Sequence, residues 1–263
     1  MNELMFWRAR RALWRLWARL PGRCTCNVCG RRVRRFLPYR GGSKYLPPLM
    51  KELGIVGSDV DQFECPSCGS TDRERHLTLY LAQSGLLEAM PGSRVLHIAP
   101  ERHLELAIRR LNPAEYVCGD LFPSRPGILT MDIQSLPFEQ GYFDFVIANH
   151  VLEHVSDDRE ALTEIARVLR PSGNAIIQTP FSTALQHRLE DPGIHSESAR
   201  LHAYGQEDHL RLYGRDWSKS FEASGQLRSN VVTHAEALPH IAGSDVGVNE
   251  LEPFMWFVRV THV

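Results

Sequence analysis

Hydrophobic positions in the second half of the chain alternate between short continuous runs and stripes at helical spacing. The runs Arg94–Ala99 and Phe143–Ala148 have the length and apolar character of buried strands. Amphipathic helices lie between such runs, and the clearest of them, Asp157–Leu169, ends before Pro171. Strands that alternate with helices predict a parallel sheet with helices on both faces. The other expected elements are a helix over Arg75–Leu87, a helix that ends near Leu111, and strands over Tyr116–Gly119, Ile128–Met131 and Asn174–Thr179.

The N-terminal segment has a helical pattern of another kind. At about 100° per residue, residues 4–20 divide into an apolar face and an opposite arginine face. Trp and Leu opposite an arginine stripe are typical of a helix that lies in a membrane interface. A surface helix docked on its own domain or on a dimer partner has the same pattern, so both environments stay open for the basic amphipathic helix expected over residues 1–22. The apolar face holds Phe6, Ala9, Leu13, Leu16, Trp17 and Leu20, and the arginine face holds Arg8, Arg11, Arg15 and Arg19.

The charge of the chain is divided unevenly, although its formal net value is only −1. Residues 1–44 contain twelve Arg or Lys against one acid, Glu3, and so carry +11, which leaves −12 for the remaining 219 residues. Such asymmetry indicates an anionic partner or surface, either a membrane or a nucleic acid. Near-neutrality of the whole chain therefore excludes neither of them.

The composition and the N-terminus also bound the location of the protein. With 43% hydrophobic and 23% charged residues, the chain has the composition of a folded globular protein. It contains no run of about 18 apolar residues, so we expect no transmembrane helix, and arginines interrupt the apolar stretch that a secretory signal needs. We expect a cytoplasmic protein with reduced cysteines, and peripheral attachment to the inner face of the membrane stays open.

Four of the six cysteines form two C-x-x-C-G motifs, Cys26 to Cys29 and Cys65 to Cys68, with 35 residues between them. Each motif can direct two thiolates to one ion, and the glycine after it allows a tight turn that aims backbone N–H groups at sulfur. Two motifs make a closed four-sulfur site, which is structural rather than catalytic. We expect structural Zn²⁺, with iron as the alternative because rubredoxins carry similar motifs, in a zinc-ribbon-like module over residues 23–72.

Polar residues directly follow four of the expected strands. Asp120, Asp132 and Asn149 stand at such positions, His150 follows Asn149, and Thr179 ends the fifth strand. Ligands of parallel α/β sheets bind at the carboxyl ends of the strands, where an acid after the second strand can hold ribose hydroxyls. One such acid is usually a cap or turn residue, but four polar positions in sequence order predict a ligand site at this edge of the sheet.

The segments LPF, FDFVIANHVLEHV and EIARVLRPSG, and a strand that ends in QTP, resemble class I S-adenosylmethionine-dependent methyltransferases of the methyltransferase-11-like group. The resemblance covers about residues 92–230. It implies a Rossmann-like α/β domain over residues 73–263 with a seven-stranded sheet in the order 3-2-1-4-5-7-6. The seventh strand would be antiparallel, and Phe254–Val260 fits it. The resemblance also implies S-adenosylmethionine as the cofactor.

By position, the resemblance implies cofactor contacts after each of the first four strands. Asp120, with the adjacent Leu121, would bind the ribose, and Asp132 with its neighbour would contact the adenine. One departure concerns the turn after the first strand, which reads HIAPERH where the family has a glycine-rich turn and an acid. Ala99 is small enough for a close backbone approach, and Glu101 could replace the missing acid. The implied cofactor-binding residues are His97, Ala99, Glu101, Asp120, Leu121, Asp132, Ile133 and Asn149.

Methyl transfer to a hydroxyl group needs a base, and the ordinary pKa of histidine suits that task. We expect two catalytic candidates, His150 after the fourth strand and His209 in the segment QEDHLRLYG. Arg211 and Tyr213, in the same segment, are expected to bind a phosphate or sugar of the substrate. Glu153 is expected to brace the turn before the next helix rather than to take part in the reaction.

Three classes of function are consistent with these features. The first is O-methylation of a small-molecule or saccharide acceptor, and a membrane-linked acceptor would explain the N-terminal helix. The second is methylation of an RNA base, because ribosomal RNA guanine-N1 methyltransferases also join a four-cysteine zinc module to this fold. However, no Lys-rich stripe or base-stacking motif continues along the catalytic body. The third is a non-catalytic scaffold, which the altered first turn suggests. We favour the first class.

Overall fold

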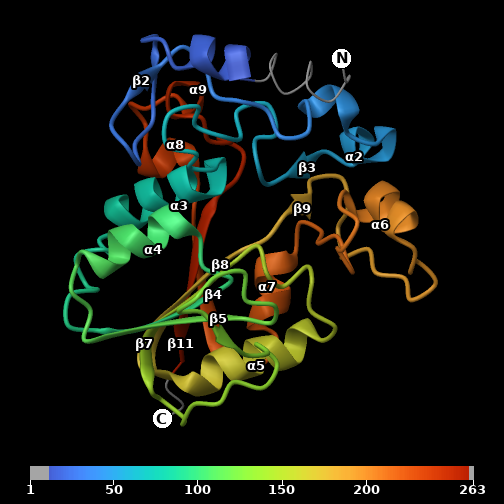
Figure 1. The fold of residues 1–263 in the computed structure, drawn as a ribbon. Helices are drawn as coiled ribbons and strands as arrows, with labels where there is room; N and C mark the ends of the chain where they lie inside the picture. The colour runs from blue at the N-terminus through green and yellow to red at the C-terminus, as the bar shows by residue number, and fades with distance from the viewer. Residues whose placement is uncertain (1–11, 261–263) are drawn as a thin grey trace.

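The computed structural model describes residues 12–260. Its centre is a seven-stranded sheet with the strand order β10-β11-β8-β7-β4-β5-β6 (Figure 1). β11 is antiparallel to both of its neighbours, whereas the pairs among β4, β5, β6, β7 and β8 are parallel. The strands are β4 (Arg94–Ile98), β5 (Glu115–Asp120), β6 (Leu129–Thr130), β7 (Phe143–Asn149), β8 (Leu169–Gln178), β10 (Leu227–Val232) and β11 (Phe254–Arg259).

The observed sheet confirms the expected α/β architecture and its strand order. Numbered along the chain within this sheet, the seven strands lie in the order 3-2-1-4-5-7-6, read from the β6 edge. The last strand in the chain, β11, is the antiparallel one. The fold is therefore Rossmann-like, with the carboxyl ends of β4, β5 and β7 side by side at one edge.

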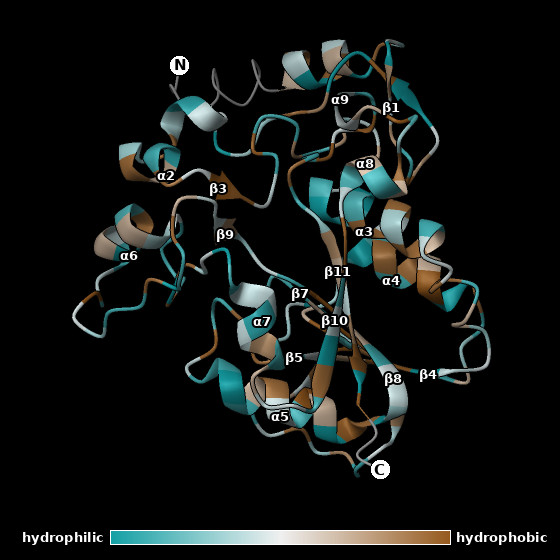
Figure 2. Cartoon of the chain, turned by 180° about the vertical axis from the view of Figure 1, so that it is seen from behind, coloured by the Kyte–Doolittle hydropathy of each residue, from teal (hydrophilic) through white to brown (hydrophobic). Residues whose placement is uncertain are grey.

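The sheet is the middle of three layers, because successive side chains of a strand point to opposite faces. In β4, for example, Leu96 packs in the core beneath α5 and α7, while Val95 packs in the core beneath α3 and α4. Helices α4 and α5 each present both apolar and polar residues (Figure 2), as expected for helices that cover a sheet. The helices are α3 (Asp72–Gln83), α4 (Arg102–Arg109), α5 (Asp158–Val168) and α7 (Trp217–Glu222).

The boundary between α5 and β8 differs from the expectation. A helix through Leu169 and a strand from Asn174 were expected, but Leu169 already pairs with β7 as the first residue of β8. The ladder then passes from Leu169, opposite Phe143, to Asn174, opposite Phe145. The Pro171-containing segment between them bulges out, because proline lacks the N–H group that a ladder needs.

The N-terminal module is interleaved with the rest of the chain rather than strung before it. Its strand β3 pairs with β9, which follows β8 in the chain. The C-terminal helix α9 lies near β1 at the top of the molecule (Figure 1). The small elements are β1 (Cys24–Thr25), β2 (Arg32–Val33), η1 (Ser43–Tyr45), α2 (Pro48–Glu52), β3 (Ile55–Val56), β9 (Phe181–Ser182), α6 (Glu197–Tyr204), α8 (His234–Ala237) and α9 (Gly243–Val246).

Residues 12–18 are helical and lie against this module. Arg15 forms an ion pair with Glu64 at 2.8 Å, and the carbonyl of Ala18 accepts a hydrogen bond from the Arg34 N–H at 2.9 Å. The helix therefore packs through Arg15 and the buried Ala18, whereas Arg19 is exposed and Arg34 stacks over the Trp17 ring at 4.9 Å. No described helix is long and apolar enough to cross a membrane. The predicted helix positions Phe6, Arg8, Ala9 and Arg11 lie outside the described residues, and the exposed apolar residues are Leu13, Leu16, Trp17 and Leu20.

Candidate active site and four-cysteine centre

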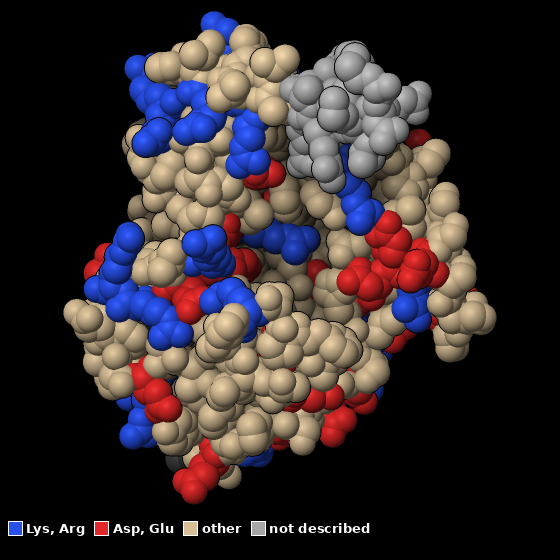
Figure 3. All heavy atoms as spheres, viewed as in Figure 1, with Lys and Arg blue, Asp and Glu red and all other residues tan. Residues whose placement is uncertain are grey.

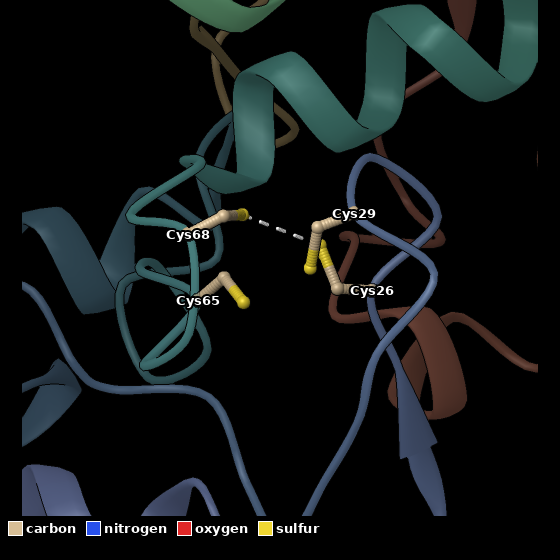
Figure 4. A group of neighbouring side chains, drawn as sticks. All are labelled: Cys26, Cys29, Cys65 and Cys68. Carbon is tan, nitrogen blue, oxygen red and sulfur yellow. Dashed lines mark hydrogen bonds between the residues drawn. The ribbon is translucent and has the colours of Figure 1, made fainter.

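The four cysteines of the two C-x-x-C-G motifs converge from two loops (Figure 4). Their sulfur atoms lie within 4.8 Å of one another, and the Sγ atoms of Cys26 and Cys68 are 3.9 Å apart. The backbone N–H groups of Ser67 and Ser70 donate to Cys65 Sγ and Cys68 Sγ, each at 3.4 Å. The structure thus brings together the four predicted ligands, Cys26, Cys29, Cys65 and Cys68.

A buried guanidinium, that of Arg75, lies beside this centre. It stacks over the Phe36 ring at 4.0 Å and donates to the backbone carbonyls of Ser70, at 2.8 Å, and Gly247, at 2.7 Å. Within the described chain, every hydrogen bond from this guanidinium goes to a backbone carbonyl and none to a carboxylate. The acidic groups near it are Asp72 and the cysteine thiols. Arg75 therefore joins α3, the cysteine loops and the C-terminal loop, and it can balance the negative charge of a thiolate centre.

The turn after β4 adopts the backbone conformation that glycine usually provides. Ala99 has a φ of 48°, in the left-handed region. Directly beside it, Glu101 Oε2 lies 2.9 Å from His97 Nε2, and Asn149 at the end of β7 donates its side-chain N–H to Glu101 Oε1. His97 Nδ1 is paired with the Tyr116 hydroxyl at 2.5 Å. Ala99 therefore adopts a backbone conformation typical of glycine, and a carboxylate occupies the junction of two central strands.

The residues predicted to hold the ribose and the adenine lie along the same edge. Asp120 ends β5, where its Oδ1 accepts a hydrogen bond from the Phe122 N–H at 2.8 Å. Leu121 and Phe122 are exposed apolar side chains, 50% and 81% exposed. After β6, Asp132 Oδ1 accepts from the Gln134 N–H at 2.9 Å, and Ile133 is buried. Apolar and carboxylate side chains thus stand next to each other at this edge of the sheet.

His150, predicted as a catalytic base, is buried directly after β7. Its Nδ1 lies 3.3 Å from Glu153 Oε1, and its Nε2 lies 3.4 Å from Glu252 Oε1. Burial and the charge of Arg73 lower the pKa of His150, but the two carboxylates outweigh them and raise it above its ordinary value. A ring between two carboxylates favours the protonated form, which argues for a positioning role; the catalytic role stays a prediction.

His209, the second predicted base, lies close to Glu153 and His154. Its Nδ1 is 3.1 Å from the Tyr204 carbonyl, and its Nε2 is buried with no hydrogen-bond partner in the described chain. Its ring meets that of His154 edge-on, with centroids 4.7 Å apart. Burial lowers the pKa of His209, so the neutral ring is favoured. Of the two predicted bases, His209 is therefore the one whose neutral ring has a nitrogen lone pair that can accept a proton.

Arg211 and Tyr213, predicted to bind substrate, are both almost fully buried. The Arg211 guanidinium donates to the carbonyls of Leu152, Val155 and Ser156 and to the Glu190 carboxylate. The Tyr213 hydroxyl donates to Asp158 at 2.8 Å. The hydrogen bonds of both side chains hold the segment after β7 in place. Their positions therefore favour a structural role over the predicted contact with substrate.

Sequence reasoning missed Glu252, which approaches His150 from the loop before β11. It is an acid in a loop a hundred residues further along the chain, with no motif around it, so no sequence signal could have identified it. Thr179 was noted as a polar residue after a strand, and the structure now shows its hydroxyl donating to Glu153 Oε2 at 3.1 Å. These contacts make the base of the site a network of buried charged groups.

The face shown in Figure 3 is hollowed between the N-terminal module above and the sheet domain below, with side chains of both charges around the hollow. The carboxyl ends of the parallel strands are directed toward the N-terminal module in Figure 1. The polar strand ends therefore lie on the side of the sheet that faces the module. Lys and Arg gather over the module at the top of the same view.

Residues 84–177 match the family model described as a methyltransferase domain. Over 141 residues, 53% of this chain, the sequence is 27% identical to a demethylmenaquinone methyltransferase from Oceanobacillus iheyensis, covering 52% of that protein. A second match, 45% identical, extends over only 49 residues, 19% of this chain and 14% of a 37.1 kDa protein in transposon Tn4556 from Streptomyces fradiae. The chain thus spans about half, or less, of these relatives.

The crystal structure of YcgJ from Bacillus subtilis covers 70% of this chain and 100% of its own, with 16% identity and a TM-score of 0.44. This likeness is weak, so the assignment of the fold rests on the strand order of the sheet. Residues 84–177 are thus similar in sequence to a methyltransferase domain, and the seven-stranded sheet, which extends to β11, has a Rossmann-like strand order.

Proposed function

We propose that the protein is an S-adenosylmethionine-dependent methyltransferase that methylates a hydroxyl group of a small-molecule or saccharide acceptor. One observation carries the proposal: Glu101, Asp120 and Asn149 stand together at the carboxyl ends of three neighbouring strands. This is the edge where α/β sheets of this class bind nucleosides. The scaffold alternative arose from the missing glycine, and it loses support because Ala99 adopts the glycine-like conformation.

The residues present fit the cofactor. Asp120 can accept hydrogen bonds from ribose hydroxyls, exposed Leu121 and Phe122 offer apolar contacts for the adenine, and Glu101 offers carboxylate oxygens for the amino group. When bound, S-adenosylmethionine supplies a methyl group on a sulfonium, so that transfer breaks a carbon–sulfur bond, forms a carbon–oxygen bond and releases the hydroxyl proton. The chain itself must position the acceptor, exclude water and accept that proton.

We propose that the four-cysteine centre binds Zn²⁺ in a structural role. Tetrahedral zinc with Zn–S bonds of about 2.3 Å places its sulfurs about 3.8 Å apart, close to the 3.9 Å between Cys26 and Cys68. Two backbone N–H groups directed at sulfur and the neighbouring Arg75 would stabilise the negative charge of the four thiolates. Such a centre would fix the two loops that carry the basic surface.

We further propose that the N-terminal helix and its module attach the enzyme to an anionic membrane. Leu13 and Leu16 are 67% and 59% exposed, and Trp17 and Leu20 extend the same outward surface. Arg34 stacks over the Trp17 ring at 4.9 Å, and apolar side chains combined with exposed arginines are suited to anionic lipid headgroups. An acceptor carried by the membrane would then lie close to the hollow between the module and the sheet. The exposed arginines are Arg19, Arg23, Arg31, Arg32, Arg34 and Arg35.

A transfer assay with a radiolabelled methyl group tests the acceptor class. The full chain would be incubated with labelled cofactor and, separately, with a membrane lipid and saccharide extract, a small-molecule extract and total RNA. We expect label in the first or second fraction, and no label there with an Asp120→Asn variant. Label in RNA alone would replace the proposal with the RNA alternative. Absence of label from every fraction would favour the non-catalytic scaffold.

A further inference from the structure

One carboxylate and two imidazoles converge beside the strand-end site, separate from the cysteine centre. Glu153, His154 and His209 each offer a ligand atom, and these atoms lie within 4.8 Å of one another. Glu153 and His154 follow β7 in the chain, whereas His209 comes from the segment after α6. The three residues belong to segments more than fifty positions apart, so the tertiary fold, and not sequence spacing, assembles them.

Glu153 and His209 each have one buried side-chain atom that lacks a hydrogen bond. Glu153 Oε1 and His209 Nε2 form no hydrogen bond in the described chain, and the two residues are 0% and 5% exposed. Glu153 Oε1 is 3.3 Å from His150 Nδ1 but without hydrogen-bond geometry. Most buried polar atoms in folded proteins are paired, and Glu153 Oε1 already faces the His150 ring, so the unpartnered Nε2 of His209 is the atom that indicates an absent electrophile.

The remaining atoms of these side chains are fixed as they are in metal sites. The Nδ1 of His209 faces the Tyr204 carbonyl at 3.1 Å, which sets the tautomer that leaves the Nε2 lone pair free. The other oxygen of Glu153 accepts a hydrogen bond from the Thr179 hydroxyl at 3.1 Å. Such outer contacts orient the ligands of metal ions in proteins.

The cluster also has a route to solvent. The His154 side chain is 28% exposed, and Asp208, whose side chain is 66% exposed, lies 3.3 Å from His154 Nδ1 through its Oδ2. An ion could therefore enter past Asp208 and reach the buried carboxylate and imidazole behind it. Asp208 could also turn to supply a fourth ligand, while the remaining positions of the ion would stay open.

We infer that Glu153, His154 and His209 bind a divalent transition-metal ion. Two imidazoles and one carboxylate suit Zn²⁺, Fe²⁺, Mn²⁺ or Co²⁺ and leave coordination positions free. Resting on the proposed methyltransferase function, the inference extends to the acceptor: an acceptor hydroxyl bound at a free position would lose its proton more readily, to water on the exposed Asp208 side of the cluster, as its oxygen takes the methyl group. His209 then serves as a ligand of the ion that binds the acceptor oxygen, rather than as the proton acceptor itself.

The test is a titration of the full, zinc-loaded chain with Co²⁺, followed by the cobalt absorption spectrum and by metal analysis after desalting. The cysteine centre is filled by Zn²⁺, so cobalt at the new site would give bands without the sulfur-to-metal charge transfer of a thiolate centre. We expect one Co²⁺ per chain in the wild type. Binding should weaken at least tenfold in Glu153→Gln and in His154→Asn, while the His202→Ala control on the exposed side of α6 should bind as the wild type does.

Each outcome decides the inference. Absence of bound Co²⁺ from the zinc-loaded wild type overturns the inference, as does equal Co²⁺ binding by the wild type, Glu153→Gln and His154→Asn. His154→Asn changes a partly exposed side chain and keeps the test valid if the buried Glu153 variant does not fold. Cofactor titration of the same samples separates the two proposals, because the chain can bind the cofactor without the metal, or the metal without the cofactor.

Discussion

The side-chain amide of Asn149 donates a hydrogen bond to Glu101, which joins the end of β7 to the turn after β4. The same carboxylate meets His97 Nε2 at 2.9 Å. Burial raises the pKa of Glu101, but its contacts with His97 and Asn149 outweigh burial and hold the pKa below its ordinary value. One ionised carboxylate therefore fixes the two strand ends and the turn on which the cofactor would rest.

Replacing Glu101 by glutamine should disturb this junction. In Glu101→Gln, one carboxylate oxygen becomes an amide N–H₂ group. That group would present a donor to His97 or Asn149 where the wild type presents an acceptor, and a buried unpaired donor is costly. We expect cofactor binding to weaken about tenfold or more, equivalent to about 1.4 kcal/mol, measured as the loss of thermal stabilisation by S-adenosylhomocysteine. Glu115→Gln, at the opposite end of β5, should behave as the wild type, and identical stabilisation of all three proteins would refute this role.

Ala99→Gly should stabilise the protein. A left-handed conformation costs an alanine about 1–2 kcal/mol that glycine does not pay, and Ala99 has a φ of 48°. Urea unfolding should show a gain of about 1 kcal/mol, reduced somewhat by the greater freedom of unfolded glycine. Ala82→Gly, at an exposed position in α3, should instead lose about 1 kcal/mol. A loss of stability in both variants would contradict the assigned turn.

Asp72 predicts a specific pH dependence of stability. Burial raises its pKa from 3.8 to about 7, although Arg73 opposes the shift. The folded state therefore keeps a proton that the unfolded state loses above about pH 4, so this group makes folding less favourable as the pH rises from about 4 to about 7. Asp72→Asn should remove that loss, and the variant should gain up to about 4 kcal/mol over the wild type by pH 8.

The measurement for Asp72 is the difference in unfolding free energy between the two proteins at several pH values. The cysteine centre is common to both, so its own acid sensitivity cancels in that difference. The difference should be small near pH 4 and should grow toward pH 8. A difference that does not change with pH would show that the folded carboxyl group titrates normally.

Membrane attachment is tested by flotation with vesicles that contain anionic lipid. Replacing Leu16 and Trp17 by serine removes apolar side chains that face outward, so the double variant should float far less than the wild type. Leu251→Ser, which changes another exposed leucine, should leave flotation unchanged. Added salt should weaken binding, because arginines contribute to it. Equal flotation of the double variant and the wild type, or retention by RNA in place of vesicles, would overturn membrane attachment.

The order of the sheet could be predicted because its buried strands are marked by local apolar runs such as Phe143–Ala148 and because the motifs resemble one family. The cysteine centre could be predicted for the same reason, because each C-x-x-C-G motif contains in its own sequence the turn that brings its two thiols together. The roles of Arg211 and Tyr213 could not be predicted, because burial against the loop after β7 depends on tertiary packing. Nor could the approach of Glu252 to His150, which joins positions a hundred residues apart.

Isothermal titration of the full chain with S-adenosylmethionine tests the central claim most directly. The account predicts one cofactor molecule per chain in the wild type. Affinity should fall about tenfold or more in Asp120→Asn, which changes the end of β5, and should be retained in Glu115→Gln, which changes its start. A folded wild-type chain that gives no heat with S-adenosylmethionine or S-adenosylhomocysteine would contradict the assignment of this sheet edge as a cofactor site.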